Sequence, residues 1–490
     1  MIDRPTWSPP ARAAVLMWAL IAGLAGAQVP PATPGEATTI TVGALGRQTF
    51  RGLGTSLGNW GGDYGKLTAA ERDRLAGLAW GGLRMRTLRL WINLDEYAPT
   101  PEARHTADFR RRYVDSGIVA DFRRLGGVEL LLAPDAMPAW LKEKRPGGPQ
   151  DFALRADAVA PYARLIAEFI AQVRAETGVA LTATGLQNEP NDLDRIDAHQ
   201  MPALVVALRR ELDARGLAAV GIIAPEAANV DSTFTDAADR LRADPAAWGA
   251  LAGLASHSYG MAATPEAARR VAAPDGSNLK DYWMTEASDN GPEAPGDAAR
   301  AASLAGRFLN DMNQRTTHWV HFLGFEAPDP NDNATRLIAY TPGPLRLTIF
   351  HKYYYYRQLA HAFDPGAVFR ACESATEGPM TWTYGRKPRL TAAAAVNPDG
   401  SWALALVNFT APTFRDDPNE PNSAANGQPA RSITATIKLP APLPARFALR
   451  RSGPHLTDAP EGEVAPVDGT LTVTLAPLEL VTLRSAAPAR

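Results

Sequence analysis

The stretch Leu181-Thr-Ala-Thr-Gly-Leu-Gln-Asn-Glu-Pro190 decides the fold of this 490-residue chain. Its apolar part, residues 181–186, predicts a buried strand, and the proline prevents that strand from continuing into a ladder. Glu189 is therefore expected at the carboxyl end of a strand. Glu286 ends a second strand-like run in the same way. Barrels of parallel strands carry their reactive groups at these ends, so we expect the two carboxylates to meet there.

Short apolar runs alternate with amphipathic helical patterns over much of the chain. The strand-like runs are residues 50–54, 87–92, 128–133, 181–186, 220–224, 254–259, 282–285 and 319–325. One helix between them is expected to begin with the capping box Thr68-Ala-Ala-Glu71, and another to cover residues 158–174. Eight strands alternating with helices predict the α/β class and a (β/α)8 TIM barrel, which we assign to residues 46–364.

The pattern changes after this region. Short strands are expected at residues 403–407, 433–439, 447–451 and 471–475, with turns at Asn397-Pro-Asp-Gly400 and Asp468-Gly469. No helical period intervenes, so residues 365–490 are expected to form a β-sandwich, with residues 416–427 as a surface loop. Residues 28–45 are expected to be a linker followed by a strand (38–42) that joins the sandwich. The tyrosines at 353–356 are expected to pack between barrel and sandwich.

The amino terminus has the pattern of an export signal. Arg4 and Arg12 precede an apolar stretch at residues 13–26, and small residues offer a cleavage site before Gln28. A retained anchor or a misassigned start is the alternative. We therefore expect residues 1–27 to be a signal peptide and the protein to be secreted or periplasmic, with no segment inserted in a membrane.

Composition narrows the class of partner. The chain has 50 basic and 52 acidic residues, a formal net charge of -2, so neither nucleic acid nor an anionic membrane is expected as a partner. Cys372 is the only cysteine, which excludes an intramolecular disulfide and a cysteine-based metal site. His318 and His321 have metal-like spacing but would point to opposite faces of a strand. Neutral polymers or small molecules fit this net charge better, and we expect a monomer with no metal and no cofactor.

Two carboxylates at strand ends suit the hydrolysis of a glycosidic bond. One carboxyl group must protonate the leaving oxygen, and the other must attack or stabilise the oxocarbenium-like carbon. Glu189 suits the acid role, because Pro190 fixes its direction and Asn188 can donate a hydrogen bond to a sugar hydroxyl. Glu286 suits the nucleophile. The alternative for either residue alone is a structural ion pair with an arginine, and the presence of both favours catalysis.

These motifs resemble those of one family of retaining β-glycosidases. Gln187-Asn-Glu-Pro190, Trp283-Met-Thr-Glu286 and Phe50-Arg-Gly-Leu-Gly-Thr-Ser56 are similar to segments of glycoside hydrolase family 30, within the large (β/α)8 clan. Three further stretches, at residues 131–142, 352–366 and 396–408, resemble other segments of this family in the expected order. The resemblance covers nearly the whole chain after the signal peptide, and it implies that Glu189 is the acid/base and Glu286 the nucleophile.

Other positions are expected to bind substrate or support the two glutamates. Arg89 matches the arginine of the family's second strand and could keep a nearby carboxylate ionised; a purely structural buried arginine is the alternative. Tyr259 could donate a hydrogen bond to Glu286 or be a rim tyrosine. Trp140 and Trp60 are candidate platforms for a sugar ring, although aromatic residues are as often part of a core.

The expected substrate is an oligo- or polysaccharide, and departures from the family pattern leave its sugar and its linkage open. This chain has Gly54-Thr-Ser-Leu57 where family members commonly have Gly-Gly-Ser-Phe, a variant that resembles the branch acting on β-1,6-galactan. At the end of its eighth strand the chain has Phe322-Leu-Gly-Phe-Glu-Ala327, where family members often have a tryptophan. Another member of the clan, such as a β-xylosidase, an arabinofuranosidase or a glucosylceramidase-like enzyme, is one alternative. A catalytically inactive carbohydrate-binding protein is another, but such a protein has no chemical need for both glutamates.

Overall fold

The computed structural model describes residues 33–57, 61–145, 151–191, 194–380, 387–411 and 428–488. The expected signal peptide, Trp60 and the expected loop at residues 416–427 lie outside these ranges.

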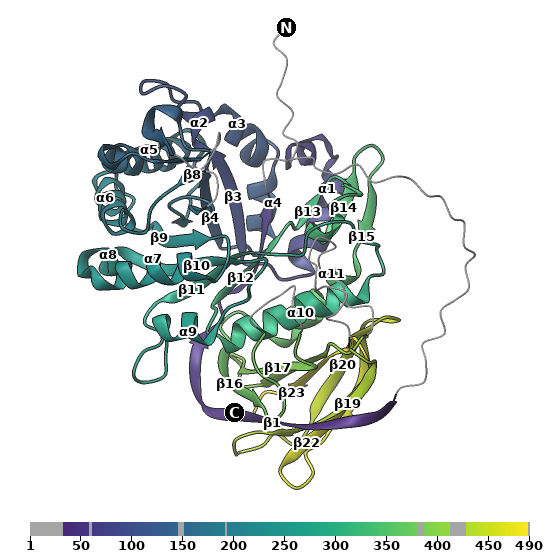
Figure 1. The fold of residues 1–490 in the computed structure, drawn as a ribbon. Coiled ribbons are helices and arrows are strands. Elements are labelled where there is room, and N and C mark those ends of the chain that lie inside the picture. Colours follow the sequence, from purple (N-terminus) through teal and green to yellow (C-terminus); the bar gives the residue numbers. More distant parts are fainter. Residues whose placement is uncertain are drawn as a thin grey trace, which may run out of the picture. The chain divides into compact units, whose positions relative to one another are not determined.

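Eight parallel strands close into a barrel, as predicted. The strands are β2 (Gly52–Leu57), β3 (Thr87–Asn93), β4 (Glu129–Asp135), β7 (Ala183–Thr184), β9 (Gly221–Ala227), β10 (Leu251–Ser258), β11 (Asp281–Ala287) and β12 (His318–Phe322). They follow one another around the barrel in chain order, and β12 pairs with β2 to close it. Figure 1 shows helices around these strands.

The bounds of all eight barrel strands differ from the prediction, by up to three residues at an end. β2 begins at Gly52 rather than Phe50, because the backbone N–H groups of Phe50 and Arg51 donate to Ala367 and Thr317 outside the β2 ladder. β7 is regular only over Ala183–Thr184. β12 ends at Phe322, and Phe325, the predicted last residue, belongs to another sheet.

The helices lie between the barrel strands and after them. They are α1 (Ala69–Ala76), α2 (Leu94–Tyr97), α3 (Ala107–Phe109), α4 (Ile118–Arg124), α5 (Val159–Thr177), α6 (Met201–Ala214), α7 (Ser232–Ala243), α8 (Pro245–Ala250), α9 (Pro265–Val271), α10 (Ala298–Asn313) and α11 (His351–Ala362). Short 3₁₀ or π segments are Gly61–Lys66, Gly77–Gly81, Arg110–Val114, Ala139–Leu141, Ala156–Ala158 and Asn333–Thr335. The capping box predicted from Thr68 and Glu71 is present at the start of α1.

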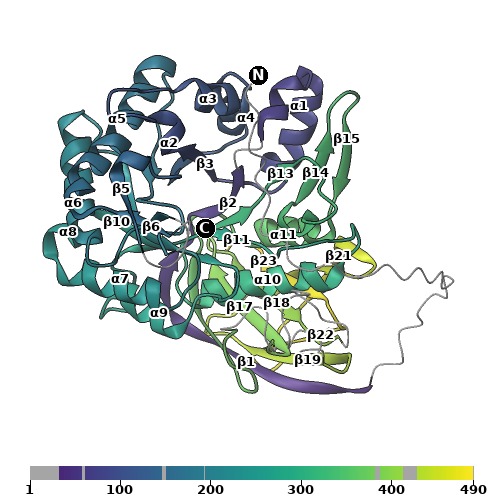
Figure 2. The same ribbon diagram turned by 45° about the horizontal axis from the view of Figure 1, so that its top comes forward.

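Two small sheets extend from the barrel loops. One contains β5 (Lys142–Lys144), β6 (Phe152–Leu154) and β8 (Asp194–Arg195). The other contains β13 (Phe325–Glu326), β14 (Ile338–Thr341) and β15 (Arg346–Ile349). The turn between β14 and β15 reaches α1, where the backbone N–H of Leu345 donates to Glu71 over 2.8 Å; Figure 2 shows these strands beside α1.

The carboxyl-terminal region is a β-domain, as predicted, but its strands form one continuous sheet of mixed direction. The strands are β1 (Thr33–Thr49), β16 (Val368–Ser374), β17 (Leu390–Val396), β18 (Trp402–Asn408), β19 (Arg431–Lys438), β20 (Phe447–Gly453), β21 (Leu456–Val464), β22 (Thr470–Leu475) and β23 (Leu480–Ser485). Their order is β21-β20-β23-β18-β17-β16-β1-β19-β22, and only the β1–β19 pair is parallel among the described pairs of this sheet.

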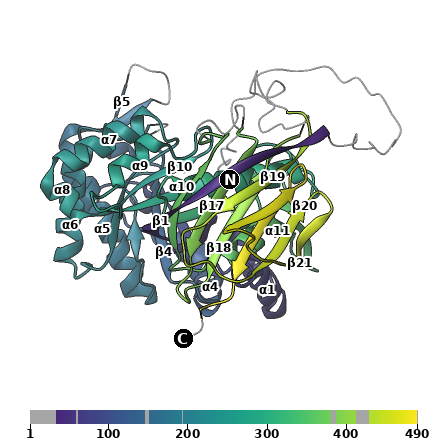
Figure 3. The ribbon, with the colours of Figure 1, turned by 90° about the horizontal axis from the view of Figure 1, so that it is seen from below.

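This sheet encloses a hydrophobic core of its own. Ile437 on β19, near one end of the strand order, and Phe447 on β20, near the other end, belong to the same buried cluster. The sheet must therefore curve over itself, which gives two layers around one core as in a sandwich. The long strand β1 supplies the predicted extra strand and begins at Thr33, within the expected linker; Figure 3 shows it beside β19.

Helices α10 and α11 lie between the barrel and the β-domain. As predicted, the tyrosines of α11 contact both: the hydroxyl of Tyr353 donates to Leu78 beside α1, and that of Tyr355 donates to Leu478 of the β-domain. Asn313 at the end of α10 donates to the carbonyl of Ala392 on β17 over 2.6 Å.

Within the described ranges, no helix is both long enough and apolar enough to cross a membrane.

Candidate active site

Glu189 follows β7 at the carboxyl end of the barrel. The backbone N–H of Asn188 donates to Pro134 on the neighbouring strand over 2.7 Å, and that of Glu189 donates to Glu226 over 3.2 Å. Glu189 has a φ of +44°, a conformation that non-glycine residues adopt rarely and that occurs often at functional sites. The turn predicted from Pro190 thus places a glutamate at the barrel mouth in a strained backbone conformation.

Glu286 lies at the end of β11, as predicted, and accepts hydrogen bonds from one residue on β3 and one directly after β10. A guanidinium nitrogen of Arg89 on β3 donates to its Oε1, and the hydroxyl of Tyr259 donates to its Oε2. The side chain of Glu286 is 4% exposed, whereas that of Glu189 is 23% exposed. The two carboxylates therefore occupy different environments: one is enclosed by donors, and the other is open toward solvent.

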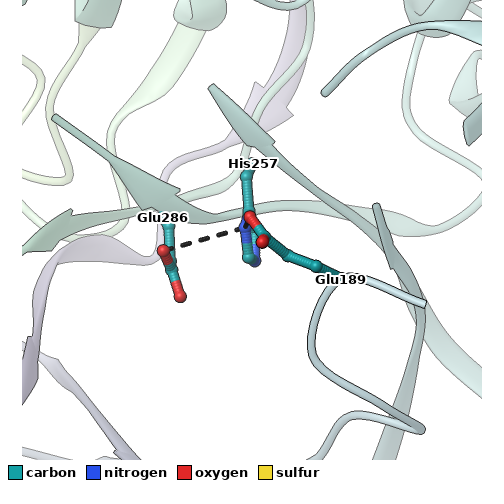
Figure 4. Close-up of side chains that lie close together, drawn as sticks. All are labelled: Glu189, His257 and Glu286. Atoms are coloured by element: carbon teal, nitrogen blue, oxygen red, sulfur yellow. Dashed lines mark hydrogen bonds and ion pairs between the residues drawn. The ribbon is translucent and has the colours of Figure 1, made fainter. Parts of the chain in front are cut away.

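His257 on β10 lies between the two glutamates and is fully buried. Its Nδ1 is 2.8 Å from Oε1 of Glu189 and 3.7 Å from Oε2 of Glu286 (Figure 4). Burial lowers the pKa of His257 to about 4, although the nearby Glu286 raises it. The imidazole is therefore neutral near pH 7, and its Nδ1 can donate to a carboxylate or accept from a carboxylic acid, depending on the tautomer.

Arg89 connects Glu286 to a further carboxylate. Its second guanidinium nitrogen donates to Asn188 over 3.0 Å and to Glu226, at the end of β9, over 3.2 Å. Arg89 and Glu226 have no exposed surface. Burial alone would lower the pKa of Arg89, but Glu226 and Glu286 raise it above its ordinary value, so this guanidinium is charged at every relevant pH.

Other titratable groups at the mouth are also shifted by burial. Burial raises the pKa of Glu226, against the effect of Arg89, and it raises the pKa of Tyr259 well above its ordinary value. Asp135, at the end of β4, has its pKa raised to about 7 by burial. A group of carboxyl groups with different environments is typical of sites that must both donate and accept protons.

The structure brings most of the predicted site residues together. Glu189, Glu286, Asn188, Arg89 and Tyr259 form one connected set with His257.

Trp140 is held elsewhere on the rim: its indole N–H donates to Ala98 over 2.9 Å and its ring is partly buried against the barrel core. A sugar platform at Trp140 stays a prediction, and Trp60 lies outside the described residues.

Sequence reasoning missed His257 and Glu226. His257 is two residues before Tyr259 in the predicted strand at residues 254–259, so the strand period places both on one face. Glu226 follows Pro225 at a strand end, which is the reverse of the residue order in Glu189-Pro190. Neither residue lies in one of the motifs that carry the family resemblance.

One set of side chains has the geometry to hold a metal ion. Among the described residues, Glu189, His257 and Glu286 each offer a ligand atom, and these atoms lie within 4.8 Å of one another. The same atoms are those needed for proton transfer and nucleophilic attack on a sugar. The expectation that no metal takes part stays a prediction.

The comparisons with known proteins find similarity in structure but not in sequence. By sequence, the chain matches no family model and no curated protein. By structure, it is similar to the catalytic domain of family-30 xylanase C from Talaromyces cellulolyticus, with a TM-score of 0.67 and 16% identity, covering 91% of this chain and 100% of that chain. It is also similar to an endo-β1,6-glucanase, with a TM-score of 0.63 and 17% identity, covering 91% of this chain and 94% of that chain.

A family-39 enzyme from Xanthomonas axonopodis pv. citri is less similar, with a TM-score of 0.54 and 14% identity, covering 94% of this chain and 99% of that chain. The chain thus has the fold of the (β/α)8 glycoside hydrolases. Its barrel and attached β-domain share their fold with the family-30 xylanase, a member of the family that the sequence motifs resemble.

Proposed function

We propose that the protein is a retaining β-glycoside hydrolase in which Glu189 is the acid/base and Glu286 is the nucleophile. The observation that carries this proposal is the spacing of the two carboxyl groups, which have oxygens within 4.8 Å of each other. Retaining enzymes hold their carboxyl groups about 5–5.5 Å apart, whereas inverting enzymes need about 6.5–9.5 Å for a water molecule.

The environments of the two groups support the assignment of roles. Glu286 receives hydrogen bonds from Arg89 and Tyr259, which direct its oxygens and favour a carboxylate that attacks carbon. Glu189 is more exposed and has a neutral imidazole beside it, so it can exchange protons with a leaving group and with water.

The reaction would proceed in two displacements. In the first, an oxygen of Glu286 bonds to the anomeric carbon while Glu189 gives its proton to the departing glycosidic oxygen. This step produces a glycosyl ester on Glu286 and an ionised Glu189. In the second, Glu189 takes a proton from water, the resulting hydroxide attacks the anomeric carbon, and the ester bond breaks. The product keeps the β configuration, and both carboxyl groups return to their starting states.

The substrate class is a β-linked glycan. The similar structures include a xylanase and an endo-β1,6-glucanase, and the Gly54-Thr-Ser-Leu57 segment resembles the branch that acts on β-1,6-galactan. We therefore propose a β-1,6-linked polysaccharide, with galactan as the first candidate. Purified protein should be screened against β-1,6-galactan, β-1,6-glucan, glucuronoxylan and glucosylceramide, with aryl β-glycosides of the same sugars alongside.

The decisive test follows the anomer first released by NMR and compares wild type with Glu286→Gln. We expect a β product from the wild type and no turnover from the variant. Initial release of the α anomer would overturn the retaining mechanism. Binding of a glycan without hydrolysis of any aryl β-glycoside would favour the carbohydrate-binding alternative.

We also propose that the protein is exported and cleaved before Gln28, on the basis of the amino-terminal pattern alone. Amino-terminal sequencing of protein from the culture medium or periplasm would test this.

A further inference from the structure

We propose that Glu226 is a positioning residue that balances the charge of Arg89 while Glu286 is a glycosyl ester. This inference rests on the proposed function, because only a covalent mechanism removes the charge of Glu286. Glu226 does not touch the reacting carbon in this scheme. It acts on the nucleophile through Arg89, and on the acid/base through its own backbone.

Arg89 lies between two carboxylates and away from water. One guanidinium nitrogen donates to Glu286, and the other is 3.2 Å from Oε1 of Glu226. The ring of Trp91 covers the guanidinium, with the Arg89 Cζ 4.8 Å from the ring centroid. A buried cation is stable only while it is paired, and loss of a partner leaves an uncompensated charge in a medium of low polarity.

The charges around Arg89 change during the reaction. Before attack, the guanidinium faces two carboxylates, Glu286 and Glu226. When Glu286 bonds to the anomeric carbon, its negative charge is lost, and the leaving group takes a proton from Glu189. Glu226 is then the buried carboxylate that still neutralises Arg89. Without it, every step toward the ester would create an unpaired buried cation, so the barrier to ester formation would rise.

The fold makes room for Glu226 at the expense of another side chain. A Cβ added to Gly185 would lie 1.6 Å from Oε2 of Glu226 and 2.7 Å from its Cδ. Position 185 must therefore be glycine as long as the Glu226 carboxylate stays in place. This glycine lies between β7 and Glu189, so the segment that leads to the acid/base is shaped to accommodate the third carboxylate.

The backbone of Glu226 supports the acid/base as well. Its carbonyl accepts the N–H of Glu189, and both residues have positive φ, +59° for Glu226 and +44° for Glu189. Two adjacent strand ends thus hold each other in conformations that neither would prefer alone. Among the described residues, Oε2 of Glu226 has no hydrogen-bond partner, whereas its Oε1 accepts from Arg89. The interaction with Arg89 is therefore the one that we assign to this carboxylate.

The test compares two isosteric pairs that differ in charge. The pairs are wild type against Glu226→Gln, and Glu226→Asp against Glu226→Asn; the second pair decides the question if the glutamine variant does not fold. Each protein is treated with an activated 2-deoxy-2-fluoro β-glycoside of the sugar that wild type hydrolyses. Intact mass shows the ester, and the concentration dependence separates the binding constant from the rate constant of ester formation. Glu129→Gln, at the opposite end of the barrel, is the control.

We expect the rate constant of ester formation to fall about 10²-fold in Glu226→Gln while the binding constant changes less than about 3-fold. The asparagine variant should likewise be at least about 10-fold slower than the aspartate variant. A loss that follows side-chain length rather than charge, or a glutamine variant that matches the Glu129→Gln control, would overturn the proposal.

Failure of the proposed function is distinguishable. In that case wild type itself forms no ester, hydrolyses no aryl β-glycoside and is indistinguishable from Glu286→Gln, and the role of Glu226 falls with it.

Discussion

Nδ1 of His257 on β10 lies 2.8 Å from Oε1 of Glu189, although Glu189 follows β7 and the two residues are 68 positions apart. The same nitrogen is 3.7 Å from Glu286, so one buried imidazole faces both candidate catalytic groups. Because the pKa of His257 is lowered to about 4, this imidazole adds no charge near pH 7. It can therefore follow the protonation state of Glu189 by changing its tautomer rather than its charge.

Replacing His257 should impair the acid step selectively. In His257→Phe, Glu189 loses the partner that directs its oxygen, so kcat/KM on a natural glycan should fall about 10- to 100-fold. Activated aryl glycosides should lose less, because their leaving groups need little protonation. His199→Phe is the control, since His199 is an exposed residue just before α6. Equal losses on both kinds of substrate would indicate a structural role for His257 instead.

Glu189→Gln should show the same selectivity more strongly. We expect about 10²- to 10⁴-fold loss on a natural glycan and a much smaller effect on ester formation from a dinitrophenyl glycoside. Combining this change with His257→Phe should add little, because both act on one proton transfer. Steady-state and pre-steady-state kinetics would measure these effects. If Glu189→Gln slows natural and activated substrates alike, the acid/base assignment is wrong.

The hydroxyl of Tyr259 should matter through its hydrogen bond to Glu286. Tyr259→Phe removes one of the two donors that direct the nucleophile, and we expect kcat/KM to fall about 10- to 100-fold on all substrates. Tyr340→Phe provides a matched control, because Tyr340 is a buried tyrosine of β14 whose hydroxyl has no partner among the described residues. A Tyr259→Phe enzyme as active as the Tyr340→Phe enzyme would remove Tyr259 from the site.

Glu326 on β13 should make the protein less stable as the pH rises. Burial raises its pKa to about 7, more than the N–H of Ala327 and Arg336 lower it. Between about pH 4.5 and 7 the folded protein therefore holds a proton that the unfolded chain releases, and the free energy of unfolding falls as pH rises through this window. The size of the effect is on the order of 3 kcal/mol.

Glu326→Gln should remove this contribution. Urea unfolding at about pH 5 and about pH 8 would measure it. The free energy of unfolding of the variant, relative to that of wild type, should be higher at about pH 8 than at about pH 5. Asp135 and Glu293, whose pKa values are also raised to about 7, affect both proteins equally and cancel in the difference. A variant whose stability follows that of wild type at both pH values would contradict the prediction.

The barrel was predictable because its strands are short apolar runs of regular spacing, and local pattern carries that information. Glu189 and Glu286 were predictable because each ends such a run. The pattern of apolar residues does not predict the turns at positive φ, such as those at Glu189 and Glu226. These turns reorient the side chains at the barrel mouth. It is these turns, together with the space above Gly185, that bring a third carboxylate to Arg89.

The β-domain shows the same limit at larger scale. Alternation and turn residues predicted its strands, but the continuity of one sheet depends on pairing between β1 and two strands more than 300 residues away in the sequence. The eighth barrel strand was predicted too long because Phe325 is extended and buried, yet it pairs with β14 outside the barrel.

The β-domain should be a structural partner of the barrel rather than a detachable module. His351 at the start of α11 is 2.8 Å from the carbonyl of Gly453, and Gln358 donates to Arg450 and Leu480 of the β-domain. Truncation after Pro365 would remove these acceptors and expose the apolar faces of α10 and α11. We expect an insoluble or inactive barrel. Recovery of a soluble, fully active fragment covering residues 28–365 would overturn this expectation.

A single methyl group offers a milder test of the same contact. A Cβ on Gly306 of α10 would lie 1.8 Å from Cζ of Phe409 in the β-domain, so Gly306→Ala must push the two apart. Overpacking of this kind costs about 1–3 kcal/mol, which should lower the midpoint of thermal unfolding by a few degrees. Gly249→Ala is the matched control, because Gly249 is also helical and its Cβ would meet nothing within 4 Å.

If barrel and β-domain unfold together, Gly306→Ala should shift one common transition measured by calorimetry and by loss of activity. A shift confined to a separate β-domain transition, with activity lost at the wild-type temperature, would show that the two parts are independent.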